Sequence, residues 1–291
     1  MAVAIGGQAA KVRPGGILQA GCAAAAYAAL GLAASRQGLW QGLAGQPLVL
    51  GLLVLLATLT FLALTVLTIS GLVLARMPAW AEALGAVACG ALWWAARHSG
   101  LPLLTDVLLI LAAGLFGALL SRIVREKDIL LPVALAAVLV DTWGVYLGFV
   151  SDISKTHPQV VAQLSASVPV AGKAMTALPV LGSIGVGDFA FMGLFLAAVA
   201  RLRLRWRETL VWLVALLVLG PTLVMAVAAL LGHPLEVLPG LVFIVIAVVA
   251  ANRKHLALNR AEWFALLYTV LVVLGVIGTY SLVRALMHRA S

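Results

Sequence analysis

The 291-residue chain contains a succession of apolar runs, each long enough to cross a lipid bilayer as a helix. A helix that spans the hydrocarbon core needs about 20 predominantly apolar residues. Runs of this kind occupy residues 15–35, 47–75, 79–96, 101–122, 129–150, 178–201, 208–231, 235–251 and 261–286. Charged residues make up 10% of the chain, against about 25% in soluble proteins. The sequence therefore predicts an all-α polytopic transmembrane helix bundle with about nine transmembrane helices.

Lys and Arg are distributed unevenly between the two sides of these predicted helices. With the N-terminus in the cytoplasm, six of the 19 basic residues lie outside, which leaves thirteen inside. The six are Arg36, Arg97, Lys155, Lys173, Arg284 and Arg289. Because cytoplasmic loops are enriched in basic residues, we expect a cytoplasmic N-terminus, in a membrane such as the bacterial inner (plasma) membrane.

The densest basic run, Arg201-Leu-Arg-Leu-Arg-Trp-Arg207, follows the sixth predicted helix. Such a run can bind nucleic acid, but beside a membrane helix it is far more often an anchor for anionic lipids. We therefore expect anionic lipids, and no nucleic acid, as its partner. The five histidines lie at loops or helix ends without the spacing of metal ligands. We expect no metal and no cofactor.

Two of the ten acidic residues, Asp141 and Asp188, lie within predicted transmembrane runs, whereas the other eight fall in loops or near helix ends. A carboxylate at bilayer depth costs a few kcal/mol and indicates a functional site. Asp141 precedes Val150, at the outer end of its predicted helix, by nine residues, and Asp188 follows Pro179 by nine, so both lie about 13 Å deep. Antiparallel neighbouring helices pack about 8–10 Å apart. If both side chains face the seam, the two carboxylates can share one proton.

Short motifs accompany both aspartates. Asp188 ends the G-x-G-D motif that begins at Gly185, Asp141 follows Val140, and Leu238-Pro-Gly-Leu241 heads the eighth predicted helix. This set, in this order, resembles the G-x-G-D intramembrane aspartyl proteases, the presenilin and signal peptide peptidase family with its archaeal and bacterial relatives. That family carries Y-D on one helix, G-x-G-D on the next and P-A-L two helices later. The resemblance covers about residues 130–250.

The resemblance implies an intramembrane aspartic endopeptidase that cleaves transmembrane segments or signal-peptide remnants. Residues 1–128 would form a four-helix membrane scaffold, residues 129–251 the catalytic helices, and residues 252–291 an extra C-terminal helix. Asp141 and Asp188 would activate water. The expected substrate-binding residues are Gly185, Gly187, Leu238, Pro239, Gly240 and Leu241.

Some features of the chain depart from the family pattern. Val140 stands where the family has Tyr, and Gly240 stands where P-A-L has Ala. The motifs also fall on the fifth, sixth and eighth predicted helices, whereas the family has them on the sixth, seventh and ninth. The missing Tyr leaves open a catalytically inactive, presenilin-like protein.

Other functions remain open at this stage. Glycines at Gly185, Gly187 and Gly240 let an unwound substrate strand approach, but small residues also serve tight helix packing. Two intramembrane aspartates can relay protons in a proton-coupled transporter. Prepilin peptidases also carry G-x-G-D, but their motif continues with a Lys, where this chain has the apolar Phe189, Ala190 and Phe191.

Overall fold

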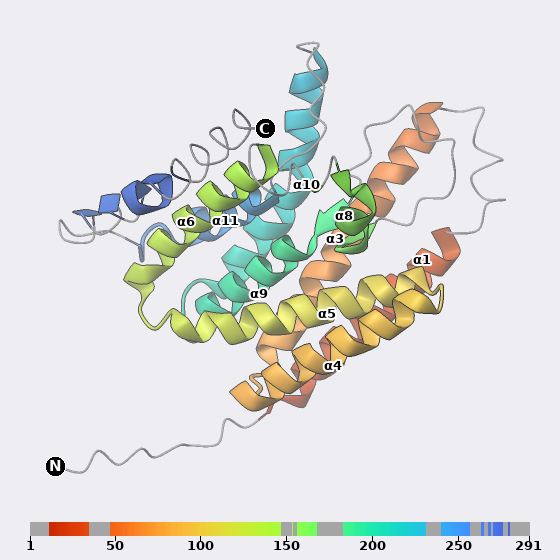
Figure 1. The fold of residues 1–291 in the computed structure, drawn as a ribbon, viewed down its shortest axis with the longest axis horizontal. Helices are drawn as coiled ribbons and strands as arrows, with labels where there is room; N and C mark the ends of the chain where they lie inside the picture. Colours follow the sequence, from red (N-terminus) through yellow and green to blue (C-terminus); the bar gives the residue numbers. More distant parts are fainter. Residues whose placement is uncertain are drawn as a thin grey trace, which may run out of the picture.

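The computed structural model describes residues 12–34, 47–146, 153, 156–167, 183–230, 240–256, 263–264, 267–268, 270–275 and 279. Within these residues the protein is mostly helical (Figure 1). Helices long and apolar enough to cross a membrane are Pro14–Ala34, Leu55–Leu74, Ala79–His98 and Pro102–Ile123. The predicted all-α fold is confirmed, and four of the nine expected spans are long and apolar enough to cross a membrane within the described residues.

The helices follow the predicted apolar runs closely over the first half of the chain. In order they are α1 (Pro14–Ala34), α3 (Pro47–Leu74), α4 (Ala79–His98), α5 (Pro102–Leu120), the short 3-10 helix η1 (Ser121–Ile123), α6 (Lys127–Tyr146), α8 (Pro158–Gln163), α9 (Val186–Arg201), α10 (Trp206–Leu230) and α11 (Gly240–Asn252). Prolines stand at the first position of α1, α3, α5 and α8, where the missing amide donor costs least.

Two short strands interrupt the helical pattern, and they correct the prediction for the sixth span. β1 (Ser165–Ser167) and β2 (Ser183–Gly185) pair antiparallel, with Ser165 opposite Gly185. The predicted helix 178–201 therefore begins only at Val186, because Gly185 is extended, with φ −69° and ψ 151°, and glycine is a poor helix former. Asp188 consequently lies in the first turn of α9, not nine residues inside a helix.

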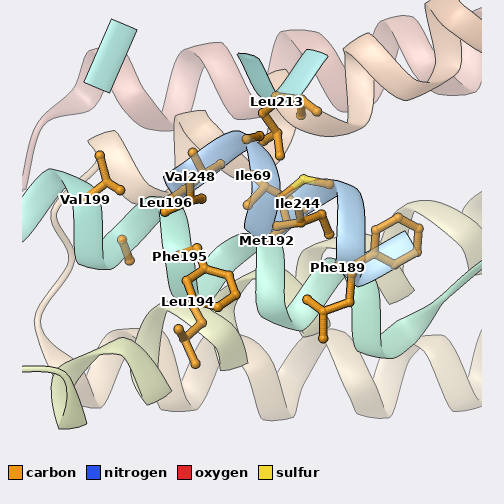
Figure 2. Close-up of a cluster of buried hydrophobic side chains, with 14 of the residues drawn as sticks. Ile69, Phe189, Met192, Leu194, Phe195, Leu196, Val199, Leu213, Ile244 and Val248 are labelled. Atoms are coloured by element: carbon orange, nitrogen blue, oxygen red, sulfur yellow. The ribbon is translucent and has the colours of Figure 1, made fainter. Parts of the chain in front are cut away.

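Helix α9 lies at the centre of the packing. It contacts α3, α5, α10 and α11, and its side chains Phe189, Met192, Phe195 and Leu196 are buried. Figure 2 shows this cluster of apolar side chains, which also includes Ile69 of α3, Leu213 of α10, and Ile244 and Val248 of α11. The position of Asp188 is thus set by a helix that is enclosed by four others.

Small residues bring α5 and α9 into backbone contact. A Cβ atom added to Gly117 of α5 would collide with the carbonyl oxygen of Ala190 of α9, and one added to Gly193 would lie 2.5 Å from the Gly114 oxygen. Such small-residue seams allow membrane helices to approach closely, which increases van der Waals contact between them. The seam fixes how far α9 can rotate or slide along α5.

Helix α11 packs against both helices that carry the aspartates, α6 and α9. It packs against both α6 and α9 more extensively than those two pack against each other, and Figure 1 shows α11 lying alongside α6. Within the described residues, α6 and α9 are therefore not the closely packed neighbours that the comparison of depths assumed. Gly240 and Leu241, at the start of α11, reach the region between the two aspartates.

Candidate functional site

The carboxylate of Asp188 is held at the N-terminus of α9. Gly185 is the N-cap residue and supplies a backbone hydrogen bond to the Asp188 side chain, three residues later. This is one half of the reciprocal pattern found in a capping box, and the helix dipole favours negative charge in the first turn. Asp188 therefore has a structural role as a helix cap, independent of any chemistry.

A contact with a helix start explains the carboxylate of Asp141 only in part. Asp141 lies near the C-terminal end of α6 and is partly buried. Leu241 of α11 supplies a backbone hydrogen bond to this carboxylate. The second oxygen, Oδ2, is buried and has no hydrogen-bond partner among the described residues. In folded proteins a buried polar atom without a protein partner usually binds ordered water, or it marks strain or a functional site.

The first residues of α11 join the two carboxylates in one site. A Cβ atom added to Gly240 would lie 2.9 Å from both Oδ1 and Oδ2 of Asp188, so the backbone of α11 runs directly against that side chain. The next residue, Leu241, bonds Asp141. The two carboxylates interact electrostatically with each other. Two helix N-termini, those of α9 and α11, thus converge on two carboxylates, where their dipoles favour negative charge.

The structure places the other predicted site residues unevenly. Gly185 lies beside Asp188, whereas a Cβ atom added to Gly187 would meet nothing within 4 Å. Leu238 and Pro239 lie outside the described residues. The Val140 side chain, at the position of the family's Tyr, is 47% exposed. The structure therefore brings together Asp141, Asp188, Gly185, Gly240 and Leu241, and leaves Gly187 facing open space.

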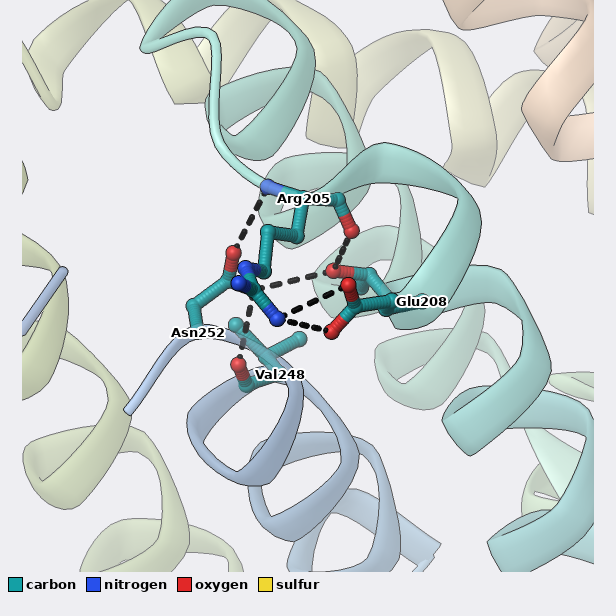
Figure 3. A network of polar contacts seen from close by, with 5 residues as sticks. Arg205, Glu208, Val248 and Asn252 are labelled. Carbon is teal, nitrogen blue, oxygen red and sulfur yellow. Dashed lines mark hydrogen bonds and ion pairs between the residues drawn. The ribbon is translucent and has the colours of Figure 1, made fainter. Parts of the chain in front are cut away.

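A polar cluster at the opposite end of α11 was not predicted from the sequence. Asn252, the last residue of α11, is fully buried, and its side-chain oxygen accepts a hydrogen bond of 2.9 Å from the Arg205 amide. Its side-chain nitrogen donates to Thr209 Oγ1 and to the Val248 carbonyl oxygen, both at 2.9 Å. Figure 3 shows this clasp, which also includes the ion pair between Arg205 and Glu208. An Asn at the end of an otherwise apolar helix was the available signal.

Two arginines of the basic run take part in contacts within the protein. Arg201 donates to the Ala118 carbonyl oxygen at 2.7 Å, which ties the end of α9 to α5. Arg205 pairs with Glu208 at 2.6 Å. Arg203 and Arg207 are exposed. Arg201 is exposed as well, and the expected contact of this run with anionic lipids stays a prediction.

Comparisons with known proteins identify no relative of this chain. No protein-family model matches the chain, and searches of curated proteins and of solved structures returned no match. Among the described residues, no group of three or more His, Cys, Asp or Glu side chains is placed to hold a metal ion. The functional interpretation therefore depends on the site itself.

Proposed function

We propose that the protein is an intramembrane aspartyl protease in which Asp141 and Asp188 act as a pair. One observation carries the proposal: a single helix start, Gly240–Leu241, contacts both carboxylates. Three sequence motifs that lie far apart along the chain thereby meet at one point. A structural role as a helix cap accounts for Asp188, but it leaves the buried Oδ2 of Asp141 without a partner.

The helix lengths support a site within the membrane. Asp141 is 14 residues from the start of α6 and Asp188 is 13 residues from the end of α9, which puts both about 20 Å from the inner ends. The hydrocarbon core is about 30 Å thick, so α9, with 16 residues, and α11, with 13, would begin inside it. Non-helical backbone at such depth is tolerated where it lines a water-filled cavity. Nine spans and a cytoplasmic N-terminus are part of this proposal.

The chemistry requires one proton shared between the two aspartates. The ionised carboxylate takes a proton from water, whose oxygen bonds to the scissile carbonyl carbon while the neutral carboxyl protonates the carbonyl oxygen. A neutral gem-diol results. The C–N bond then breaks as the dyad returns a proton to the leaving nitrogen and takes one from the diol, which regenerates the carbonyl as a carboxylic acid. The orphaned Oδ2 of Asp141 can accept the proton of the attacking water.

The strand before Asp188 offers a way to present the substrate. A helical substrate hides its own amides, so cleavage requires an unwound segment whose backbone finds other partners. Within the described residues, β2 pairs only with β1, and a peptide can add to the free edge of such a sheet. β2 ends at Gly185, three residues before Asp188. A peptide paired there would run past the open space at Gly187 toward the dyad.

Cleavage assays on the purified protein test this function. The full-length chain is reconstituted in liposomes with single-span substrates and signal-peptide remnants, and the products are identified by mass spectrometry. We expect cleavage by the wild type and by Asp128→Asn, which changes an acid at the start of α6. Asp141→Asn and Asp188→Asn should abolish it. Cleavage that survives either of these two substitutions overturns the proposal.

A proton-coupled transporter is the second candidate, and the two short helices favour it. Transporters often bind ions at the N-termini of helices that begin in mid-membrane, as α9 and α11 would. The discriminating measurement is proton flux in the same liposomes, followed with a pH-sensitive dye inside the lumen. Flux that depends on Asp141 and Asp188, without any peptide product, favours the transporter. Neither flux nor product, in a folded protein, favours an inactive presenilin-like protein.

A further inference from the structure

A polar cavity, separate from the two aspartates, opens between α4, α5 and β1. Its volume is about 280 Å³, and its walls include Arg97, Thr105, Asp106, Gln163 and Ser165. Arg97 comes from the last turn of α4 and Asp106 from the start of α5. Both helices are candidate membrane spans, so the turn between them lies at the membrane surface. The expected orientation places this surface outside the cytoplasm.

The Arg97 guanidinium lies over two aromatic rings, and its N–H groups make no hydrogen bond within the part of the chain that the structure describes. Its guanidinium carbon lies 5.8 Å from the ring centroid of Trp93 and 5.5 Å from that of Trp94. No hydrogen bond or ion pair of Arg97 occurs among the described residues. A guanidinium has five N–H donors and matches phosphate geometry well. Trp side chains in turn favour the interface between lipid headgroups and water. The arrangement presents a fixed cation at headgroup level.

We propose that this cavity binds the headgroup of a phospholipid, with its phosphodiester on Arg97. Lipid phosphate is always present at this depth, and Leu101 at the cavity is 51% exposed, where acyl chains can cover it. The remaining wall carries the oxygen acceptors of Thr105 and Gln163. These favour a headgroup that carries its own donors, an ammonium or hydroxyls, over choline, which carries none. Phosphatidylethanolamine is the simplest lipid of this class.

The cavity is linked to the aspartate site through the pairing of β1 with β2. Ser165 lines the cavity and pairs with Gly185 in the sheet. Gly185 in turn supplies the backbone hydrogen bond to Asp188. The adjacent bond from the Val186 amide to the Leu164 oxygen measures 2.8 Å. A bound headgroup would steady β1, and through β2 the start of α9. This regulatory part rests on the proposed protease function, whereas lipid binding itself does not.

Lipid retention tests the binding independently of catalysis. The full chain is reconstituted in phosphatidylcholine nanodiscs with and without phosphatidylethanolamine, and lipid that remains bound after release into detergent is counted by native mass spectrometry. We expect one retained phosphatidylethanolamine in the wild type and about a tenfold lower occupancy in Arg97→Gln, because a charge-assisted hydrogen bond is lost. Arg125→Gln, which removes the same charge at the opposite membrane surface, should retain the lipid.

The other outcomes overturn the proposal. One is that Arg97→Gln and the wild type retain the same amount of phosphatidylethanolamine. Another is that the wild type retains phosphatidylcholine as well as it retains phosphatidylethanolamine. The third is that millimolar inorganic phosphate displaces the lipid, which would indicate a free-phosphate site. If Arg97→Gln does not fold, a photoreactive phosphatidylethanolamine on the wild type replaces it. Its crosslinks should map to residues 97–106 or 163–165, and crosslinks elsewhere contradict the site.

Cleavage measurements then test the connection to the aspartates. With an active protein, phosphatidylethanolamine should raise kcat severalfold in the wild type and in Arg125→Gln, but not in Arg97→Gln. An Arg97→Gln variant that instead raises KM only for substrates with acidic outer flanks would assign the cavity to the substrate, against the lipid. An inactive protein that still retains the lipid through Arg97 would refute the protease function and leave the lipid site standing.

Discussion

The two ends of helix α11 differ in how completely their buried polar atoms are hydrogen-bonded. At its C-terminal end, the buried Asn252 side chain uses its oxygen and its nitrogen in three hydrogen bonds of 2.9 Å. At its N-terminal end, the buried Oδ2 of Asp141 has no partner among the described residues. The same helix therefore ends in a satisfied polar clasp and begins beside an acid that has one unpartnered oxygen.

The difference separates a structural polar group from a reactive one. A satisfied buried network stiffens a fold and specifies one arrangement, whereas an unsatisfied polar atom destabilises it. Folded proteins keep such local violations chiefly at functional sites. Because α11 is anchored at Asn252, its other end can hold Gly240 and Leu241 against the two carboxylates without help from them. The clasp provides the stability that the aspartate site lacks.

The largest effect should come from breaking the aspartate pair. Positioned acid–base groups contribute about 10²–10⁴-fold to rate, so Asp141→Asn and Asp188→Asn should each lower kcat by at least this factor. Residues that act as one unit are strongly non-additive. The double variant should therefore be no slower than either single one, measured as product formed per hour in liposomes. Losses that multiply in the double variant would show that the two acids act independently.

Breaking the clasp should have the next largest effect, and on stability. Asn252→Leu removes the hydrogen-bond partner of the Arg205 amide and one partner of the Thr209 hydroxyl. An unsatisfied buried group costs about 1–3 kcal/mol. The free energy of unfolding in detergent should fall by this amount, with activity falling alongside it. Thr209→Val removes two bonds of the same network, to Asn252 and to the Arg205 carbonyl oxygen, but leaves the Arg205 amide paired with Asn252, so it should cost less. Equal stability of wild type and Asn252→Leu would remove the contrast between the two ends.

Adding one methyl group at Gly240 should disturb the site without disturbing the fold. The new Cβ atom would lie 2.9 Å from both carboxylate oxygens of Asp188, so the side chain must shift by a few tenths of an ångström. Because a misplacement of about 1 Å can cost 10²-fold in rate, we expect Gly240→Ala to lower kcat about tenfold. Gly90→Ala, whose Cβ atom meets nothing within 4 Å, is the control. A faster Gly240→Ala enzyme would contradict this geometry.

Hydrophobicity alone predicted most of the helices and could not predict where α9 begins. The runs at 47–75, 79–96 and 101–122 match α3, α4 and α5 to within two residues, because lipid or protein must cover every apolar residue there. The start of α9 was placed eight residues early. Ser183–Gly185 is apolar enough to continue a helix on composition, but its backbone pairs with β1, and that partner is distant in sequence.

The motifs identified the members of the site but not how they meet. Matching depths suggested that Asp141 and Asp188 face each other across two neighbouring helices. In the structure α11 comes between, and Gly240 and Leu241 make the contacts. Asn252 carried no motif at all. Its importance depends on the Arg205 amide, a backbone group whose position only the folded chain defines.

The smallest expected change in stability comes from a leucine substitution at the other end of α11. This variant is also the sharpest test of the contrast between the two ends. Asp141→Leu removes a carboxylate that costs a few kcal/mol at bilayer depth, together with its repulsion from Asp188, and loses one hydrogen bond worth about 1 kcal/mol. We expect the free energy of unfolding in detergent to rise by about 1 kcal/mol while cleavage is abolished. Leucine would then stabilise the protein at position 141 and destabilise it at Asn252. If both leucine variants are destabilised alike, Asp141 is a structural residue, and the unsatisfied end of α11 is not a site kept for chemistry.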